Sequence, residues 1–226
     1  MRENLTEIVF ILDRSGSMSG LESDTIGGFN SLINKQQKED GEALISTVLF
    51  DDEAEVIHDR VPIKDVKKLT EDDYYVRGCT ALLDAVGGAI HHIGNVHKYA
   101  REEDRPAKTL FVITTDGMEN ASRRYSFKDI KRMIERQKER YHWEFLFLGA
   151  NIDAAEVAGE MGISRDRAAN YNCDEEGTVL NYRVLEAAVT CARKCKSADI
   201  ATAFDGGDWK EDIDRDYENR GKRRMK

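Results

Sequence analysis

The chain has 226 residues, of which 40% are apolar, and its 34 basic and 43 acidic side chains give a formal net charge of −9. This length and apolar content suit one α/β domain with a sizeable core and exclude a disordered chain. The acidic balance disfavours binding to nucleic acid through the phosphate backbone. The apolar runs have the length of strands and fall short of the roughly 18 residues that a membrane span needs.

The N-terminal residues and the cysteines bear on the cellular compartment. No apolar signal region precedes the first strand-like segment, so we expect a cytoplasmic protein that does not bind membranes. A zinc site would be expected as paired Cys-x-x-Cys motifs, which the sequence lacks. We interpret the cysteines as structural, because they are too few for a disulfide scaffold of this length; they are Cys79, Cys173, Cys191 and Cys195.

Strand and helix patterns alternate along the first half of the chain. The continuous apolar run Glu7–Asp13 predicts a buried strand, and Leu21–Lys38 has the apolar spacing of an amphipathic helix. Ala43–Phe50 and Ala54–Ile63 are predicted strands joined by a short turn. Parallel strands need a crossover of a dozen or more residues, so the second of them should run antiparallel. A further helix is predicted over Thr80–Tyr99.

The second half continues the alternation and then changes character. Strands are predicted over Lys108–Thr115 and Trp143–Gly149, with a weak edge strand over Ala168–Cys173. Residues 197–226 carry charges of both signs and few large apolar side chains, so we predict a polar, mobile tail beyond a domain of residues 1–196. One helix should follow each of these three strands. The first should begin at an N-cap on Ser126 and end at about Arg140, and the other two should cover Ala154–Met161 and Thr178–Lys196.

This order of elements predicts an α/β fold with a doubly wound, mostly parallel six-stranded sheet and helices on both faces. The predicted strand order is 3-2-1-4-5-6, with Ala54–Ile63 as an antiparallel strand at one edge. Ligands of such sheets bind outside the carboxyl ends of the strands, where the strand order reverses beside the first strand.

Oxygen-bearing side chains gather in three loops that should meet at this point. Asp13, Ser15 and Ser17 follow the first strand, Thr80 precedes a helix, and Asp116 follows the fourth strand. Alternate residues of an extended loop point to the same side, so the first three can face one position. An oxygen set without His or Cys suits Mg²⁺ or Mn²⁺, with Ca²⁺ possible and Zn²⁺ not preferred. A coordination position left open could accept a carboxylate from another molecule.

The D-x-S-x-S motif, followed by this Thr and this Asp, resembles the metal-ion-dependent adhesion site of von Willebrand factor type A domains, also called integrin I-like domains. The resemblance covers about residues 5–196 and is closer to compact stand-alone bacterial members than to secreted adhesion domains. It implies that Ser15 and Ser17 bind the ion directly. It also implies that Asp13, Thr80 and Asp116 bind it directly or through water.

Three further residues lie close to the motif in the sequence. Asp84 follows Thr80 by one helical turn and could hold a metal-bound water or a loop hydroxyl, with an ordinary surface or capping role as the alternative. Glu119 and Asn120 are expected on the rim of the site, where they could tune the choice of partner.

The favoured interpretation is a metal-dependent interaction module that binds an acidic group of a protein partner. The competing interpretations are a metal-dependent hydrolase, such as a phosphoesterase, and a chaperone-type accessory factor. A hydrolase would need a placed general base, a second metal cluster or a phosphate-cradling loop, and the sequence shows none of these. The partner, its pathway, the physiological metal and the oligomeric state do not follow from the sequence.

Overall fold

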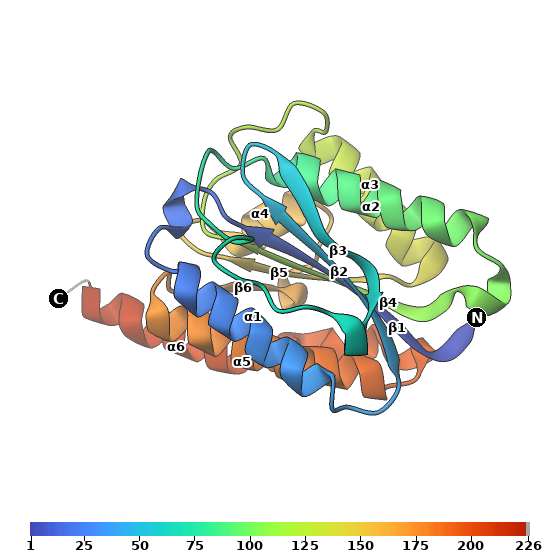
Figure 1. The fold of residues 1–226 in the computed structure, drawn as a ribbon. Coiled ribbons are helices and arrows are strands. Elements are labelled where there is room, and N and C mark those ends of the chain that lie inside the picture. The colour runs from blue at the N-terminus through green and yellow to red at the C-terminus, as the bar shows by residue number, and fades with distance from the viewer. Residues whose placement is uncertain (225–226) are drawn as a thin grey trace.

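The computed structural model describes residues 1–224 and contains one six-stranded sheet of order β3-β2-β1-β4-β5-β6 (Figure 1). All neighbouring strands pair in parallel except β2 and β3, which are antiparallel. The predicted strand order and antiparallel edge strand are therefore confirmed. The strands are β1 (Arg2–Asp13), β2 (Glu42–Phe50), β3 (Ala54–Pro62), β4 (Pro106–Thr115), β5 (Glu144–Gly149) and β6 (Ala168–Asn170).

Helices cover both faces of the sheet (Figure 1). One face carries α1 (Glu22–Gln36), α5 (Glu175–Lys194) and α6 (Glu211–Arg224), and the other carries α2 (Leu82–Tyr99), α3 (Phe127–Tyr141) and α4 (Ala154–Glu160). The short 3-10 helices are η1 (Gly16–Met18), η2 (Ile63–Asp65), η3 (Glu102–Asp104), η4 (Arg165–Arg167), η5 (Ser197–Asp199) and η6 (Thr202–Lys210).

The central strand β1 contributes to the apolar cluster on each face. Successive side chains of a strand point to opposite faces, so Phe10 and Leu12 join the cluster under α1 and α5, whereas Val9 and Ile11 join the one under α2. Burial on both faces explains why this strand is a continuous apolar run in the sequence.

Local signals set the ends of two helices. At the start of α3, the Ser126 hydroxyl accepts the backbone N–H of Asp129, and the Asp129 carboxylate accepts the N–H of Ser126. This reciprocal pair is a capping box. After α4, Gly162 has a φ of 83°, a left-handed conformation that glycine adopts without strain. Both signals agree with the helix limits predicted from the sequence.

The C-terminal segment differs from the predicted mobile tail. Residues 197–224 form η5, η6 and α6, and Ile200, Phe204 and Ile213 are almost fully buried in the apolar cluster under α5. These apolar residues are scattered among charges, so the composition of the segment conceals them. Residues 225 and 226 of the predicted tail lie outside the described residues, and the domain limit at residue 196 stays a prediction.

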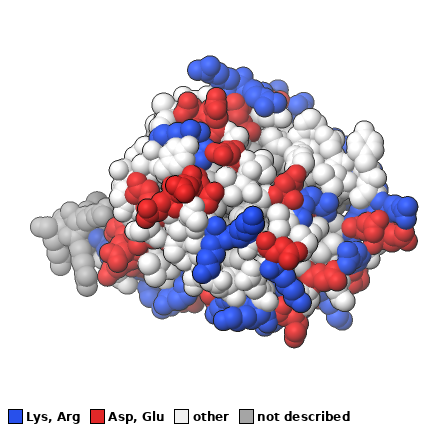
Figure 2. Space-filling view, in the orientation of Figure 1, with Lys and Arg blue, Asp and Glu red and all other residues white. Residues whose placement is uncertain are grey.

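Charges of both signs are intermixed on the face of the molecule that Figure 2 shows. One exposed ion pair joins Arg215 to Glu211 on α6, at 2.7 Å. Exposed ion pairs stabilise a fold by only about 0–1 kcal/mol, so the two apolar clusters carry most of the stability. Among the helices of residues 1–224, none combines the length and the apolar character needed to cross a membrane.

Candidate metal centre

The structure brings the five predicted ligands together at the carboxyl ends of β1 and β4. The hydroxyl oxygens of Ser15 and Ser17 lie 3.0 Å apart, Ser17 donates to Asp116 Oδ1 at 2.5 Å, and Thr80 donates to the Ser15 hydroxyl at 3.1 Å. Asp13 Oδ1 accepts the Ser15 backbone N–H at 2.7 Å. Ser17 is exposed and the other four are almost fully buried, so the cluster opens to solvent at Ser17. Their role as metal ligands stays a prediction.

The spacing of these oxygens fits a cation of the size of Mg²⁺. Octahedral Mg²⁺ holds its ligands at about 2.0–2.1 Å, which places neighbouring ligand oxygens about 3 Å apart. The separations of 3.0 and 3.1 Å from Ser15 to Ser17 and to Thr80 match this length. Among the described residues, no group of three or more His, Cys, Asp or Glu could hold a metal ion. Serine and threonine hydroxyls would therefore have to complete the ligand set.

Burial makes the two carboxylates of the cluster costly to ionise. It raises the pKa of Asp13, to which nearby Asp116 adds a smaller effect, and it also raises the pKa of Asp116. Hydrogen bonds to both carboxylates oppose these shifts without cancelling them. Because carboxylate ligands must be deprotonated, cation affinity should weaken as the pH falls through these raised pKa values.

Thr80 is held in place by the loop that follows β4. Its backbone N–H donates to Asn120 Oδ1 at 3.0 Å, and its carbonyl accepts the N–H groups of Asn120 and Ala121 at 3.1 and 3.2 Å. Glu119 in the same loop accepts the N–H of Leu83 at 2.9 Å, in the first turn of α2. These contacts fix the position of the threonine relative to Asp116. The effect of Glu119 and Asn120 on partner choice stays a prediction.

Comparison with known proteins places this site on a known fold. No protein-family model matches the sequence, and the search of curated proteins returned no match. Proximal thread matrix protein 1 from the mussel byssus, solved with a zinc-occupied MIDAS motif, matches at a TM-score of 0.56 with 14% identity over 83% of this chain and 46% of that chain. A von Willebrand factor type A protein from Catenulispora acidiphila matches at 0.51, with 14% identity over 84% and 43% of the respective chains. The chain has the fold of a von Willebrand factor type A domain.

A third solved structure, the PilB minor pilin from Streptococcus sanguinis, matches this type A fold at a TM-score of 0.54. It shares 10% identity over 89% of this chain and 64% of that chain. The chain therefore spans between about two fifths and two thirds of the length of these three structures. At this identity the likeness establishes the fold, and the chemistry of the site has to be argued from the residues of this chain.

Within the type A fold, Asp84 fixes the loop between β4 and α3. Its carboxylate accepts the backbone N–H groups of Arg123 and Arg124 at 2.9 Å each and that of Tyr125 at 3.0 Å. The carboxylate therefore serves the loop backbone, and a role of Asp84 toward a metal-bound water stays a prediction. The loop that carries Glu119 and Asn120 is thereby anchored to α2.

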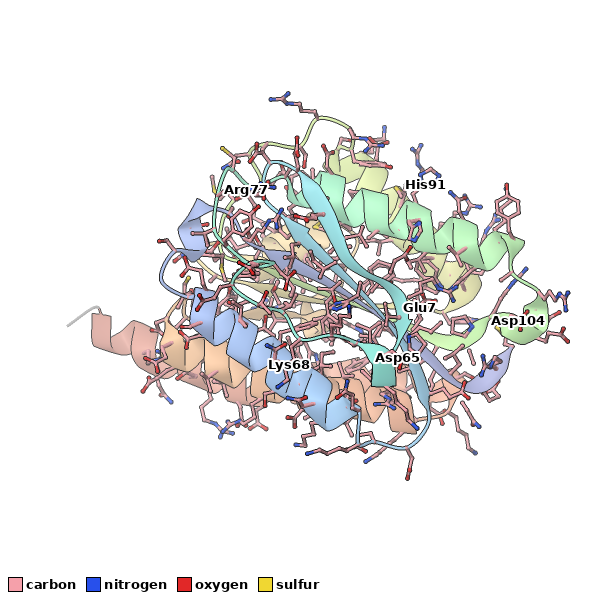
Figure 3. All side chains as sticks on the ribbon, in the orientation of Figure 1. Glu7, Asp65, Lys68, Arg77, His91 and Asp104 are labelled. Atoms are coloured by element: carbon pink, nitrogen blue, oxygen red, sulfur yellow. The ribbon has the colours of Figure 1, made fainter. Side chains whose placement is uncertain are left out.

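Arg14 turns away from the site into the interior. Its guanidinium is fully buried and donates from Nε to Asp51 Oδ2 at 2.8 Å, and it also forms an ion pair with Glu55 at 2.7 Å. Arg77, which is labelled in Figure 3, donates from its own Nε to the same Asp51 oxygen at 2.8 Å. Asp51 therefore ties the loop after β1 to the segment that leads into Thr80.

Two residues that the sequence analysis did not place at the site contact Asp116. Asn151, after β5, donates from Nδ2 to the Asp116 carbonyl at 3.2 Å. Cys173, after β6, lies with Sγ 3.5 Å from Asp116 Oδ2. Burial, together with the nearby Asp116 charge, raises the pKa of Cys173 to about 12, so it remains a thiol at neutral pH. Both residues follow strands of the parallel sheet, and this position was the signal that could have located them.

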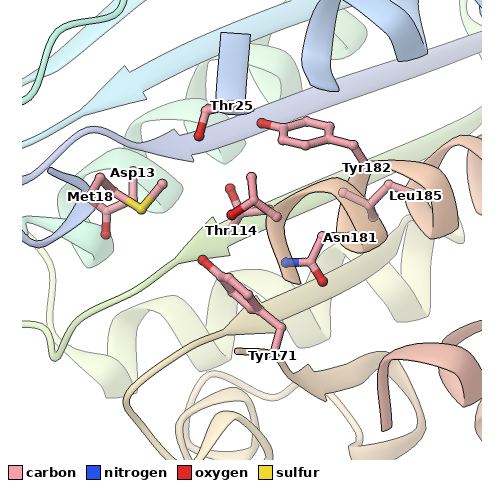
Figure 4. A pocket seen from close by; sticks show the side chains of 9 residues that line it. Asp13, Met18, Thr25, Thr114, Tyr171, Asn181, Tyr182 and Leu185 are labelled. Carbon is pink, nitrogen blue, oxygen red and sulfur yellow. The ribbon is translucent and has the colours of Figure 1, made fainter. Parts of the chain in front are cut away.

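A small cavity lies beside Asp13, between the sheet and helices α1 and α5 (Figure 4). Its volume of about 20 Å³ is enough for one water molecule. Thr178 Oγ1 and Asn181 Oδ1 on its α5 side are buried and have no hydrogen-bond partner among the described residues. Helix α5 therefore places these two polar atoms in a cavity that also borders Asp13. The other lining residues are Met18, Thr25, Thr114, Tyr171, Tyr182 and Leu185.

Asp116→Asn is expected to stabilise the cation-free protein at pH 7 and to weaken cation binding. An Asp whose pKa rises on folding destabilises the fold when it ionises. This cost is present at neutral pH and disappears below the unfolded pKa near 3.8. In thermal melts, the variant should melt higher than wild type in EDTA and gain less from Mg²⁺. Equal gains from Mg²⁺ in both proteins would place the cation elsewhere.

Proposed function

We propose that the chain is a metal-dependent protein-interaction module. In this proposal a divalent cation, held by the five oxygen-bearing residues of the candidate metal centre, accepts a carboxylate from a protein partner. The observation that supports it most is the convergence of the D-x-S-x-S loop with Thr80 and Asp116 on a type A fold, with oxygen separations that suit a small cation.

The carboxylates and the hydroxyls of the site would have different roles in binding the cation. Asp13 and Asp116 supply two negative charges that balance a 2+ ion, while the neutral hydroxyls of Ser15, Ser17 and Thr80 add ligands without further charge. When bound, the cation supplies a Lewis-acidic centre for an anionic oxygen. Ser17 is the exposed member of the set, so the partner would approach from its side.

The donor set supports Mg²⁺ or Mn²⁺ as the cation, because both suit oxygen ligands. Ca²⁺ takes six to eight oxygens at 2.3–2.6 Å and would need the loops to relax. The mussel protein holds zinc in its own MIDAS motif. For this chain, a preference for Mg²⁺ or Mn²⁺ over Zn²⁺ stays a prediction, as does a location in the cytoplasm.

A pull-down from the source cell tests the proposal with three proteins, wild type, Ser15→Ala and Ser19→Ala, each in Mg²⁺ and in EDTA. Ser19 is exposed just after the first loop and is the matched control. Proteins bridged by the cation should be retained by wild type and Ser19→Ala in Mg²⁺, and lost in EDTA and with Ser15→Ala. A set of bound proteins that is the same in all conditions would refute the proposal. Metal-dependent turnover of generic phosphoesters that Asp13→Ala abolishes would instead support the competing hydrolase.

A further inference from the structure

Cys173 contacts Asp116, the carboxylate of the site that follows β4. Its Sγ donates to Asp116 Oδ2 at 3.5 Å, whereas the other oxygen of that carboxylate, Oδ1, accepts the Ser17 hydroxyl at 2.5 Å. The two oxygens therefore have different surroundings. Oδ1 faces the oxygen cluster that would hold the cation, and Oδ2 faces the loop after β6.

A carboxylate held on one oxygen alone is poorly oriented. The last torsion of an Asp side chain is broad and roughly two-fold, so packing alone does not choose which oxygen faces a metal. A donor on the outer oxygen fixes the plane of the carboxylate, as the supporting hydrogen bonds of metal ligands generally do. Asp13 has such a donor, since the Thr115 hydroxyl donates to its Oδ2 at 2.6 Å. Cys173 occupies the corresponding position at Asp116.

The loop that carries Cys173 is anchored on both sides of this residue. Asn172 donates from Nδ2 to Asp216 of α6 at 3.0 Å, and Arg220 of α6 pairs with Asp174 at 2.6 Å. Asp174 also caps α5 by accepting the N–H of Gly177 at 2.9 Å. Anchors on both neighbours of Cys173 hold its backbone beside Asp116, within reach of the contact between Sγ and Oδ2.

We propose that Cys173 is a positioning residue of the metal site, whose thiol holds Asp116 with Oδ1 turned toward the cation. The inference rests on the proposed function, because it assigns a role toward the same cation. It also separates Cys173 from Cys79 and Cys191, which are exposed, and from Cys195, which is partly buried away from the site.

The test compares cation affinity in four proteins, wild type, Cys173→Ala, Cys173→Ser and Cys191→Ala, by titration calorimetry with Mg²⁺ and Mn²⁺. Loss of a supporting hydrogen bond costs about 10- to 100-fold in metal affinity, and a thiol is a weak donor, so Cys173→Ala should lose about tenfold. Cys173→Ser keeps a donor and should remain close to wild type. Cys191 is exposed on α5, and its replacement should change nothing.

Melting temperatures in EDTA separate positioning from packing. Cys173→Ala and Cys173→Ser should melt alike without the cation and differ only in cation affinity. Wild-type affinity in Cys173→Ala would overturn the inference and leave the proposed function standing. A Ser variant as weak as the Ala variant would also overturn it, because the donor would then not be the cause. A wild-type protein that binds neither cation would overturn the proposed function and this inference together.

Discussion

Ser15→Ala is expected to lower the affinity for Mg²⁺ by at least about tenfold and to abolish cation-dependent partner binding. The Ser15 hydroxyl lies at the centre of the oxygen cluster, 3.0 Å from that of Ser17 and 3.1 Å from that of Thr80. Its removal takes away a proposed ligand and the contacts that align two others. Even the loss of a group that only supports a metal ligand lowers metal affinity by about 10- to 100-fold. Ser17→Ala should weaken both metal and partner binding in the same way.

Thr80→Ala should behave differently from the two serine variants. Thr80 belongs to a separate loop, and the other four side chains would still hold the ion. We therefore expect partner binding to fall more than metal binding. Calorimetry gives the affinity for Mg²⁺, and binding of a captured partner is then measured at saturating Mg²⁺ for each variant. A Thr80→Ala protein with normal partner binding would show that this loop takes no part in recognition.

Asp51→Asn is expected to destabilise the fold by about 3 kcal/mol, because breaking a buried ion pair by neutralising one partner costs about 3–5 kcal/mol. Asp51 and Arg14 are both almost fully buried, and Arg77 pairs with the same Asp51 oxygen as Arg14. The remaining pair of Arg14 with the exposed Glu55 places the expected loss at the low end of the range. Urea unfolding at pH 7 measures the effect, and Glu55→Gln is the control that should cost far less.

The pH dependence of this variant provides an independent check. Burial raises the pKa of Asp51. Hydrogen bonds from Arg77, the Glu53 N–H and Arg14 together lower this pKa by more than burial raises it, so the net pKa lies below its ordinary value. A lowered pKa contributes stability that is present above the unfolded value of 3.8 and is lost as the pH falls through the folded value. The gap between wild type and Asp51→Asn should therefore shrink below about pH 3.8. A gap that is constant from pH 7 to pH 3 would show that the ion pair is not its source.

The sequence by itself determined the architecture, because the features that define it are local. The unbroken apolar run of β1 marks a strand buried on both faces, and the short turn after Phe50 forces β3 to run antiparallel. The capping residue Ser126 and the glycine after α4 mark helix ends within a few residues. These signals need no knowledge of distant contacts.

The candidate metal centre was predictable for a related reason. Its residues follow strands of a parallel sheet, and the carboxyl ends of such strands meet at one edge whatever the details of packing. The D-x-S-x-S spacing places Asp13, Ser15 and Ser17 on one side of their loop, and Asp116 directly follows the neighbouring strand β4. The order of strands was therefore sufficient to bring these residues together.

Only the tertiary structure decided which side chains support the site and whether the C-terminal segment packs. Cys173 contacts Asp116, although the two lie 57 residues apart in the sequence. The Asp84 carboxylate binds the loop after β4 and not the oxygen cluster of the metal centre. The composition of residues 197–224 is mainly polar, yet Ile200 and Phe204 are buried in the apolar cluster under α5. Hydrogen bonds and burial depend on which surfaces meet at atomic distance. A one-dimensional pattern does not contain that information, because the same residue is a ligand support, a cap or a core side chain according to its neighbours in space.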